Sequence, residues 1–185
     1  MWQQVYQKHR DKFNLLAVAM DVQGPDKPRV YAEKAKAAYP VAVDQENVLG
    51  KMFNFKAIPN AIFVDEGGIV RYAKFGGFDI RKPEFAKITE DWITGSTKQD
   101  VLAISEVEAD RGMKHPEALR FYDEGLHLYR AGKRTEAAQA WRKVIAIEPD
   151  NYIVRKNMWV VEHPERFYGD EIDNAWQREQ IAKGQ

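Results

Sequence analysis

The chain has 185 residues, of which 44% are hydrophobic, so it is long enough for one large domain or two small ones. Lysine plus arginine equals aspartate plus glutamate at 28 each, which argues against nucleic acid or an acidic membrane held by bulk charge. Cysteine is absent, which excludes disulfides, thiolate metal sites and thiol nucleophiles formed by these residues. No apolar run reaches membrane-spanning length, and the first residues lack the apolar core of a signal peptide.

The first half of the chain alternates helix and strand patterns. Apolar side chains recur every three or four residues over 2–13, which predicts an amphipathic helix. Residues 14–21 form a near-continuous apolar run, which predicts a strand buried on both faces. A second helix is predicted over 29–39, a short strand over 40–44 and a closing amphipathic helix over 83–93.

Residues 57–65 are the most informative stretch of this half. Ile58-Pro59 precedes the apolar run Ala61–Val64, and proline, which cannot donate to a strand ladder, suits the mouth of a strand. Its X-Pro bond is a candidate cis peptide. A turn signal, Asp-Glu-Gly-Gly at 65–68, and an alternating run over 69–75 complete a predicted β-hairpin.

From residue 47 onward the sequence shows a fixed order of features. The order is a short helix, an apolar residue, proline, a small polar residue, a strand, aspartate, a glycine turn and a second strand. This order resembles the proline loop and terminal hairpin of thioredoxin-fold proteins, closest to the TlpA/ResA-like redoxin family. The resemblance covers roughly residues 2 to 95 and implies an α/β fold, a thioredoxin-like domain with a mixed sheet and flanking helices. It implies the thiol-disulfide oxidoreductase family and the cell envelope or periplasm. Ile58 and Asn60 depart from the family, which usually has threonine beside the proline.

Two parts of the family pattern are missing. The family's Cys-x-x-Cys at the start of its first helix has no counterpart, so we expect no catalytic residue and no redox activity of this chain alone. The family's central strand, between the strands like 14–21 and 61–65, is also missing, which leaves two inner sheet edges unpaired. We therefore expect a sheet that closes differently, borrows a strand, for example from another copy in a homo-oligomer, or belongs to a longer chain.

The sequence leaves two main functions open, beside a peroxiredoxin identity whose catalytic cysteine motif is equally absent. One is the larger part of a TlpA/ResA-like oxidoreductase whose redox centre lies upstream of Met1. The other is a redox-dead scaffold that binds a protein or peptide. Neither implies a cofactor or a metal, since the four histidines have no ligand spacing.

The second half has a different pattern. After domain 1–95, residues 96–116 are polar and irregular and are interpreted as a linker, with a short ordered piece at 101–104. Residues 117–162 are interpreted as one tetratricopeptide (TPR) repeat, whose length is about 34 residues, plus a capping helix over 151–161. The tail, 163–185, is interpreted as a docking helix or a frayed end, with Trp176 and Ile181 as anchors.

Within the TPR pattern, Gly125 takes the small position where the two helices cross, and Ala137 and Trp141 take the paired positions of the second helix. The inner face of the first helix would form a groove for a hydrophobic peptide or for an intramolecular contact. The residues of this predicted groove are Leu119, Tyr122, Leu126 and Tyr129, with Arg130 at its edge.

Three further sites have competing interpretations. In the resembled family the proline loop receives the substrate chain, so Ile58, Pro59 and Asn60 are interpreted as a peptide-contact loop or as a turn that the fold requires. Asp65-Glu66 is interpreted as turn chemistry rather than as a catalytic acid pair. Asp44 and Glu46 precede a helix, and capping accounts for them.

Overall fold

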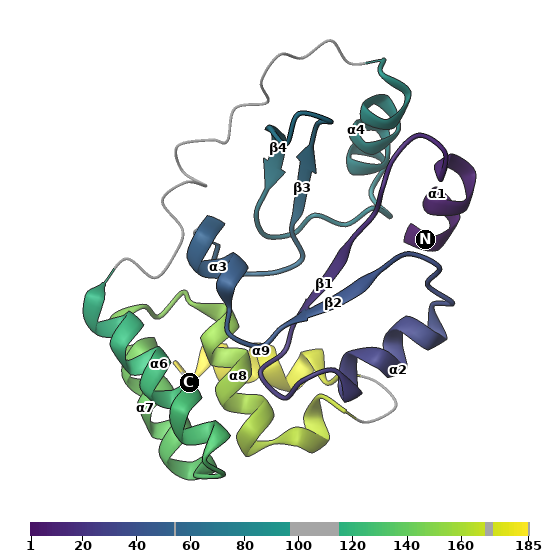
Figure 1. The fold of residues 1–185 in the computed structure, drawn as a ribbon. Helices are drawn as coiled ribbons and strands as arrows, with labels where there is room; N and C mark the ends of the chain where they lie inside the picture. Colours follow the sequence, from purple (N-terminus) through teal and green to yellow (C-terminus); the bar gives the residue numbers. More distant parts are fainter. Residues whose placement is uncertain (54, 97–114, 169–171, 185) are drawn as a thin grey trace. The chain divides into compact units, whose positions relative to one another are not determined.

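The computed structural model describes residues 1–53, 55–96, 115–168 and 172–184 (Figure 1). These residues form two compact units. The strand unit comprises Met1–Gln45 and the described residues from Ala57 to Ser96, and the helical unit comprises Glu46–Lys56 and the described residues from His115 onward. Whereas the sequence placed 1–95 in one domain, Glu46–Lys56 groups with the helices. The predicted linker, 96–116, falls almost wholly outside the described residues, as does its short piece at 101–104.

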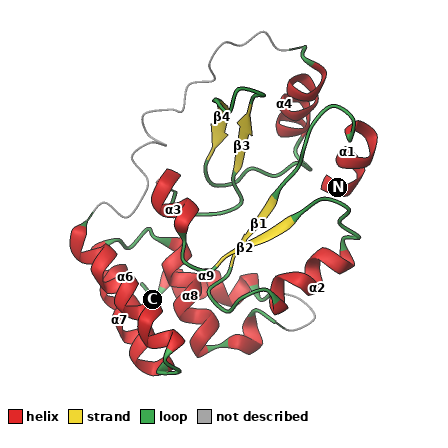
Figure 2. Cartoon of the chain, viewed as in Figure 1, coloured by secondary structure: helices red, strands yellow, loops and turns green. Residues whose placement is uncertain are grey.

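The strand unit has α/β character, and its element order follows the sequence prediction (Figure 2). The second helix starts earlier than the expected 29–39, with Pro28 in its first turn, and ends earlier, before Lys36, whose φ is +50°. The elements are α1 (Trp2–His9), β1 (Ala17–Met20), α2 (Asp26–Lys34), β2 (Val41–Asp44), β3 (Ala61–Val64), β4 (Val70–Lys74) and α4 (Pro83–Thr94).

The strands form two separate two-stranded sheets instead of the expected mixed sheet. β1 pairs with β2 in parallel, with Ala17 opposite Val41, and β3 pairs with β4 as an antiparallel hairpin with Ala61 opposite Lys74. Within the described residues no strand joins the two sheets. The prediction that β1 is buried on both faces is wrong, because Met20 is its one buried residue and the preceding Leu16 is 60% exposed.

One core cluster of the strand unit lies between the hairpin and the helices α1 and α4. Its buried members are Ala61, Tyr72 and Phe78, and partly buried Trp2, Phe63, Phe85 and Ile88 pack against them. Helix α1 connects this core with the region before β2: Trp2 stacks on Phe78 with ring centroids 6.2 Å apart, and Tyr6 meets Tyr39 at 5.6 Å. Since no strand joins the two sheets in the described residues, side chains of α1 hold the two regions together.

The helical unit is built on three consecutive helices where the sequence predicted them. Gly125 is buried, and a Cβ at this position would lie 2.3 Å from Nε1 of Trp141, so the prediction that Gly125 allows α6 and α7 to cross closely is confirmed. The elements are α3 (Val48–Phe53), α6 (Pro116–Arg130), α7 (Arg134–Ile147), α8 (Tyr152–Glu162), the 3₁₀ turn η1 (Pro164–Arg166) and α9 (Asn174–Ala182).

The tail contains a docking helix. In α9, Trp176 packs edge-on against Trp159 of α8 with ring centroids 5.5 Å apart, and Gln177 is buried. Asp173 caps α9 by accepting a hydrogen bond from the backbone N–H of Trp176. Trp176 is therefore an anchor, as expected, but Ile181 is not, because its side chain is 47% exposed.

Candidate functional site

The predicted peptide-contact loop is hydrogen-bonded to the segment that follows the hairpin. Ile58–Pro59 is a cis peptide bond. The carbonyl oxygen of Pro59 accepts a hydrogen bond from Phe78 N at 3.1 Å, and Asn60 Oδ1 accepts one from Gly76 N at 2.6 Å. Pro59 is exposed, whereas Ile58 and Asn60 are half-buried. Two of the loop's acceptors are therefore engaged inside the strand unit, and Pro59 remains accessible.

The free edge of β1 is the second feature of the strand unit. Ala17 N donates to Pro40 O at 3.1 Å and Asp21 N to Asp44 O at 3.3 Å, so these two N–H groups point toward β2. Backbone N–H groups alternate between the two sides of a strand, so those of Val18 and Met20 point toward the opposite edge. No strand of the described residues pairs with that edge. The N–H groups of Val18 and Met20 therefore have no partner strand among the described residues.

Asp65, the first residue of the acidic pair at the hairpin tip, stabilises the turn. Asp65 Oδ1 accepts hydrogen bonds from the backbone N–H groups of Gly67 and Ile69, each at 2.9 Å, and Oδ2 accepts one from Arg71 at 2.6 Å. The bond from Ile69 N–H and the bond from Arg71 hold the pKa of this carboxyl below its ordinary value. The prediction of turn chemistry is confirmed for Asp65.

The predicted groove on α6 is largely covered. Tyr122 and Leu126 are buried, Leu119 and Tyr129 are half-buried, and only Arg130 is exposed. Trp141 of α7 packs against the rings of Tyr122 and Tyr129 at 6.5 Å and 6.1 Å between centroids. Of the two uses left open for this face, the structure realises intramolecular contact.

Part of that contact comes from Glu46–Lys56, here called the crossing segment, which contains α3. Arg130 Nη2 of α6 donates to Glu46 Oε1 at 2.6 Å, so the role of Glu46 includes an ion pair with the groove's edge. Lys51 Nζ lies 2.8 Å from Asp123 Oδ1 and 5.1 Å from the ring centroid of Tyr122. The crossing segment thus lies on α6 and contacts two of the five groove residues.

The end of the crossing segment reaches α8. Ile153 N donates to the carbonyl oxygen of Lys56 at 3.1 Å. Lys56 Nζ lies 3.1 Å from Asp150 Oδ1 and 3.9 Å from Oε2 of the buried Glu148. Asn151 holds Glu148 in place through a hydrogen bond from Nδ2 at 3.0 Å. The acidic corner between α7 and α8 is therefore neutralised in part by Lys56.

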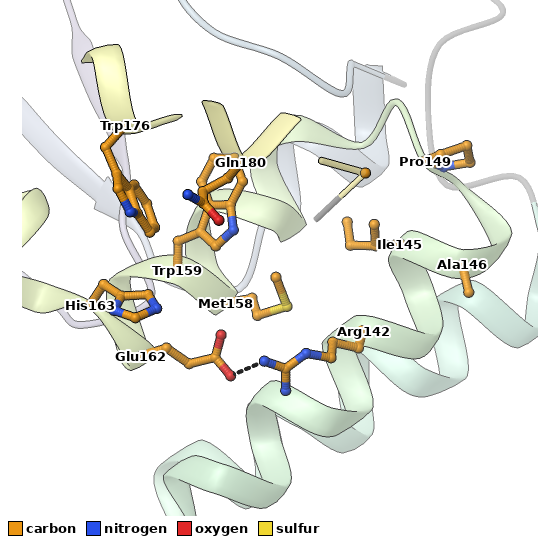
Figure 3. Close-up of a pocket in the computed structure, with 11 residues that line it drawn as sticks. Arg142, Ile145, Ala146, Pro149, Met158, Trp159, Glu162, His163, Trp176 and Gln180 are labelled. Atoms are coloured by element: carbon orange, nitrogen blue, oxygen red, sulfur yellow. Dashed lines mark hydrogen bonds and ion pairs between the residues drawn. The ribbon is translucent and has the colours of Figure 1, made fainter. Parts of the chain in front are cut away.

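A hollow of about 360 Å³ lies between α7, α8 and α9 (Figure 3). An ion pair between Arg142 and Glu162 lies on one side of it, and the indole rings of Trp159 and Trp176 lie on the other. Apolar side chains of Ile145 and Met158 add to its wall. Arg142 and Glu162 pair with each other, and His163, which also lines the hollow, has its Nδ1 3.6 Å from Oε1 of Glu165.

Arg155 of α8 is 5% exposed and has no carboxylate partner among the described residues. Its Nη2 donates to the carbonyl oxygen of Pro149 at 2.6 Å, and the guanidinium lies 5.8 Å from the Trp159 ring centroid. Its Nη1 makes no hydrogen bond within the described part of the chain. Burial lowers the pKa of this guanidinium, since desolvation disfavours the charged form.

The described ranges contain neither a metal-binding cluster nor a membrane-spanning helix. No three histidine, aspartate or glutamate side chains converge there on a point that could hold an ion. None of the described helices combines the length and the apolar character required to cross a bilayer.

Comparison of the chain with protein-family models, curated proteins and solved structures gives no match. The likeness to TlpA/ResA-like redoxins and to TPR repeats therefore rests on the residues of this chain alone.

Sequence reasoning found the face of α6 but missed what covers it and missed the hollow beside α9. The charges of Glu46, Lys51 and Lys56 could have indicated that the crossing segment lies on the helices. They are opposite to those of their partners Arg130, Asp123 and Asp150. No sequence signal indicated the hollow, because its residues come from three helices and the tail.

Proposed function

We propose that this chain is a protein-binding module whose strand unit accepts an extended segment of a partner at the free edge of β1. The observation that carries the proposal is the direction of the Val18 and Met20 N–H groups, which face away from β2. An extended chain added to such an edge gains main-chain hydrogen bonds and places alternate side chains against the sheet. The absence of cysteine supports binding rather than thiol chemistry by these residues.

Exposed apolar side chains on the strand unit support the same proposal. Proteins protect the edges of their sheets with charges, bulges or covering elements, and an apolar edge favours association. Leu16, which directly precedes β1, is 60% exposed, and the other exposed large apolar side chains of this unit lie at Met1, on α2, on β2 and at the hairpin turn. A second copy of the chain and a different protein are both candidate donors of the added strand.

A proline substitution at the free edge tests the proposal. Val18→Pro removes an N–H that β2 does not use, while the Ala17 and Asp21 bonds to β2 remain. We expect the 185-residue chain to co-purify with a partner or to self-associate at high concentration, and the Val18→Pro chain to lose this association. Val41→Pro is a matched control on β2, the other strand of this sheet, away from the free edge of β1. Association that survives Val18→Pro would contradict the proposal.

A second candidate is a TlpA/ResA-like thiol-disulfide oxidoreductase whose Cys-x-x-Cys is supplied from outside these residues. The proline loop before the hairpin, the order of the strand unit and the unjoined sheets favour it. We expect no reduction of insulin disulfides by this chain alone, because no thiolate is available. An in-frame strand followed by Cys-x-x-Cys in the coding sequence before Met1 would support this candidate, and a stop codon directly before Met1 would contradict that arrangement.

A TPR-type role in protein interaction is proposed for the helical unit on its helix order, on Gly125 at the helix crossing and on Trp141 packed against it. Tyr122 and Leu126 are buried and are not directly accessible to a partner. The exposed Arg130, at the edge of this face, is accessible. A redoxin family member of this kind belongs in the cell envelope or periplasm, which fractionation of tagged protein would test.

A further inference from the structure

The crossing segment is part of the helical unit, although in sequence it lies between β2 and β3 of the strand unit. Its three charged side chains each meet the opposite charge on α6 or at the corner between α7 and α8: Glu46 with Arg130, Lys51 with Asp123, and Lys56 with Asp150. Known modes of peptide recognition use anchoring side chains, main-chain hydrogen bonds and complementary charges, and the crossing segment makes contacts of all three kinds.

The anchors of the segment are concentrated at its end. Phe55 is buried, Lys56 lies against the buried carboxylate of Glu148, and Ile153 N–H bonds to the Lys56 carbonyl. This bond also satisfies one of the first N–H groups of α8, which have no partner within their own helix. The end of the segment therefore contributes more to binding than the beginning.

The earlier part of the segment combines buried residues, Asn47 and Gly50, with exposed ones. The Glu46–Arg130 pair is exposed on both sides, with side-chain exposures of 55% and 57%, and such pairs contribute little. Helix α3 has 6 residues, fewer than a helix needs to form alone in water, and Met52 on it is 67% exposed. The segment is therefore ordered by the surface on which it lies and not by its own helix.

We propose that the crossing segment is a built-in ligand that occupies a peptide-docking surface of the helical unit and blocks it against other peptides. The docking surface is formed by Asp123, Arg130, Glu148, Asp150 and the N–H of Ile153. Its ligand is a short peptide with an acidic residue, a lysine five residues later, and an aromatic residue directly before a second lysine. Covalent attachment gives the built-in ligand a high effective concentration, so a separate peptide must compete with it. The proposal concerns the helical unit alone and does not depend on strand addition at β1.

The test measures binding of a fluorescein-labelled peptide of residues 46–56 to the full chain by fluorescence anisotropy. The loosened variant carries Glu46→Ala, Lys51→Ala and Lys56→Ala, which weaken the built-in ligand and leave the docking surface intact. We expect it to bind the peptide at least about tenfold more tightly than the unsubstituted chain. A matched control carries Lys12→Ala, Glu33→Ala and Lys34→Ala, three exposed residues of the strand unit, and should bind like the unsubstituted chain.

A peptide with K51E and K56E should not bind any of these chains, since both lysines would face carboxylates. Equal affinity of the loosened and control variants for the unmodified peptide would overturn the proposal. A second measurement uses the unsubstituted chain and so does not depend on how the loosened variant folds. Excess peptide should speed hydrogen exchange of amides in α3 and leave α7 unchanged; no change in α3 at saturating peptide would also overturn it.

Discussion

The strand unit and the helical unit differ in where their backbone hydrogen bonds are made. Each helix of the helical unit satisfies most of its backbone groups within itself, and the side chains of Asn151 and Asp173 cap the starts of α8 and α9. Each strand of the strand unit has one partner strand among the described residues, so its other edge is open. Two-stranded sheets are at best marginally stable on their own, so packing against α1 and α4 stabilises the hairpin.

The cores of the two units are built from different elements. In the helical unit Trp141, Trp159, Tyr122, Val144 and Val154, all on helices, are almost completely buried. In the strand unit Phe75, Phe78 and Ile80, which follow the hairpin, are buried, and Trp2 and Phe63 are partly buried. The comparison teaches that both units bury aromatic side chains, whereas only the helices close their backbone hydrogen bonds locally.

The largest expected effect is that of removing the central side chain of the helical unit. Trp141 is fully buried and contacts Tyr122, Tyr129 and Gly125, so Trp141→Ala should lower the free energy of unfolding of this unit by about 3–5 kcal/mol. Urea denaturation followed by far-UV circular dichroism measures it. Gln139→Ala, at an exposed position of the same helix, should change little. A loss as small as that of Gln139→Ala would mean that Trp141 is not the centre of this core.

The second-largest effect on stability is expected from adding a methyl group at Gly125, where α6 and α7 cross. Gly125→Ala would place a Cβ 2.3 Å from Nε1 of Trp141, so α6 and α7 must move apart, at a cost of about 1–3 kcal/mol. The same denaturation experiment measures this cost, with Glu124→Ala as the exposed neighbour for comparison. Stabilisation by Gly125→Ala, the usual result at an unhindered helix position, would show that the helices do not cross so closely.

Hydrogen exchange compares the two units directly. Amides of residues 15–20 and 61–64 should exchange at least about tenfold faster than those of 136–146 in a monomer, because β1 and β3 each lack a strand on one side. A higher protein concentration should slow exchange in 15–20 and 61–64 wherever a second copy supplies a strand. Equal protection of all three ranges in a demonstrated monomer would remove the distinction between the units.

The smallest effect is expected at the tip of the hairpin. The folded state lowers the pKa of Asp65 below its ordinary value of 3.8, so the stabilisation by its carboxylate is complete above that value and is lost as the pH falls through the folded pKa. Nuclear magnetic resonance should show the Gly67 and Ile69 amides shifting with this low pKa. Asp65→Asn should remove the transition while leaving the helical unit unaffected. A pKa at or above 3.8 would contradict the hydrogen bonds to Asp65.

Local features of both units were predictable from the sequence. The hairpin follows from an apolar run, an Asp-Glu-Gly-Gly turn and a second alternating run, and α6, α7 and α8 follow from helical periodicity and from small residues at crossing points. These patterns are local because a turn or a helix is specified by residues within a few positions of one another. The predicted peptide-contact loop could be located for the same reason, since its proline directly precedes β3.

Other features depended on residues that are distant in the sequence. Sequence reasoning placed the crossing segment with the strands, because it lies between β2 and β3 in the chain, and could not foresee its ion pairs with Arg130 and Asp123. It likewise treated Ile181 and Trp176 as equal anchors, although only Trp176 reaches Trp159. Each outcome depends on which face of a helix meets which neighbour.

The sequence by itself determined the order of helices and strands, the absence of thiol chemistry and the glycine at which two helices cross. Periodicity, residue type and the lack of cysteine are properties of the chain before it folds. Only the tertiary structure decided that the strands remain in two separate sheets, that α1 connects them and that the face of α6 is covered by Trp141 and the crossing segment. The physical reason is that pairing and burial are gained between residues tens of positions apart, where charge, shape and backbone direction must agree simultaneously.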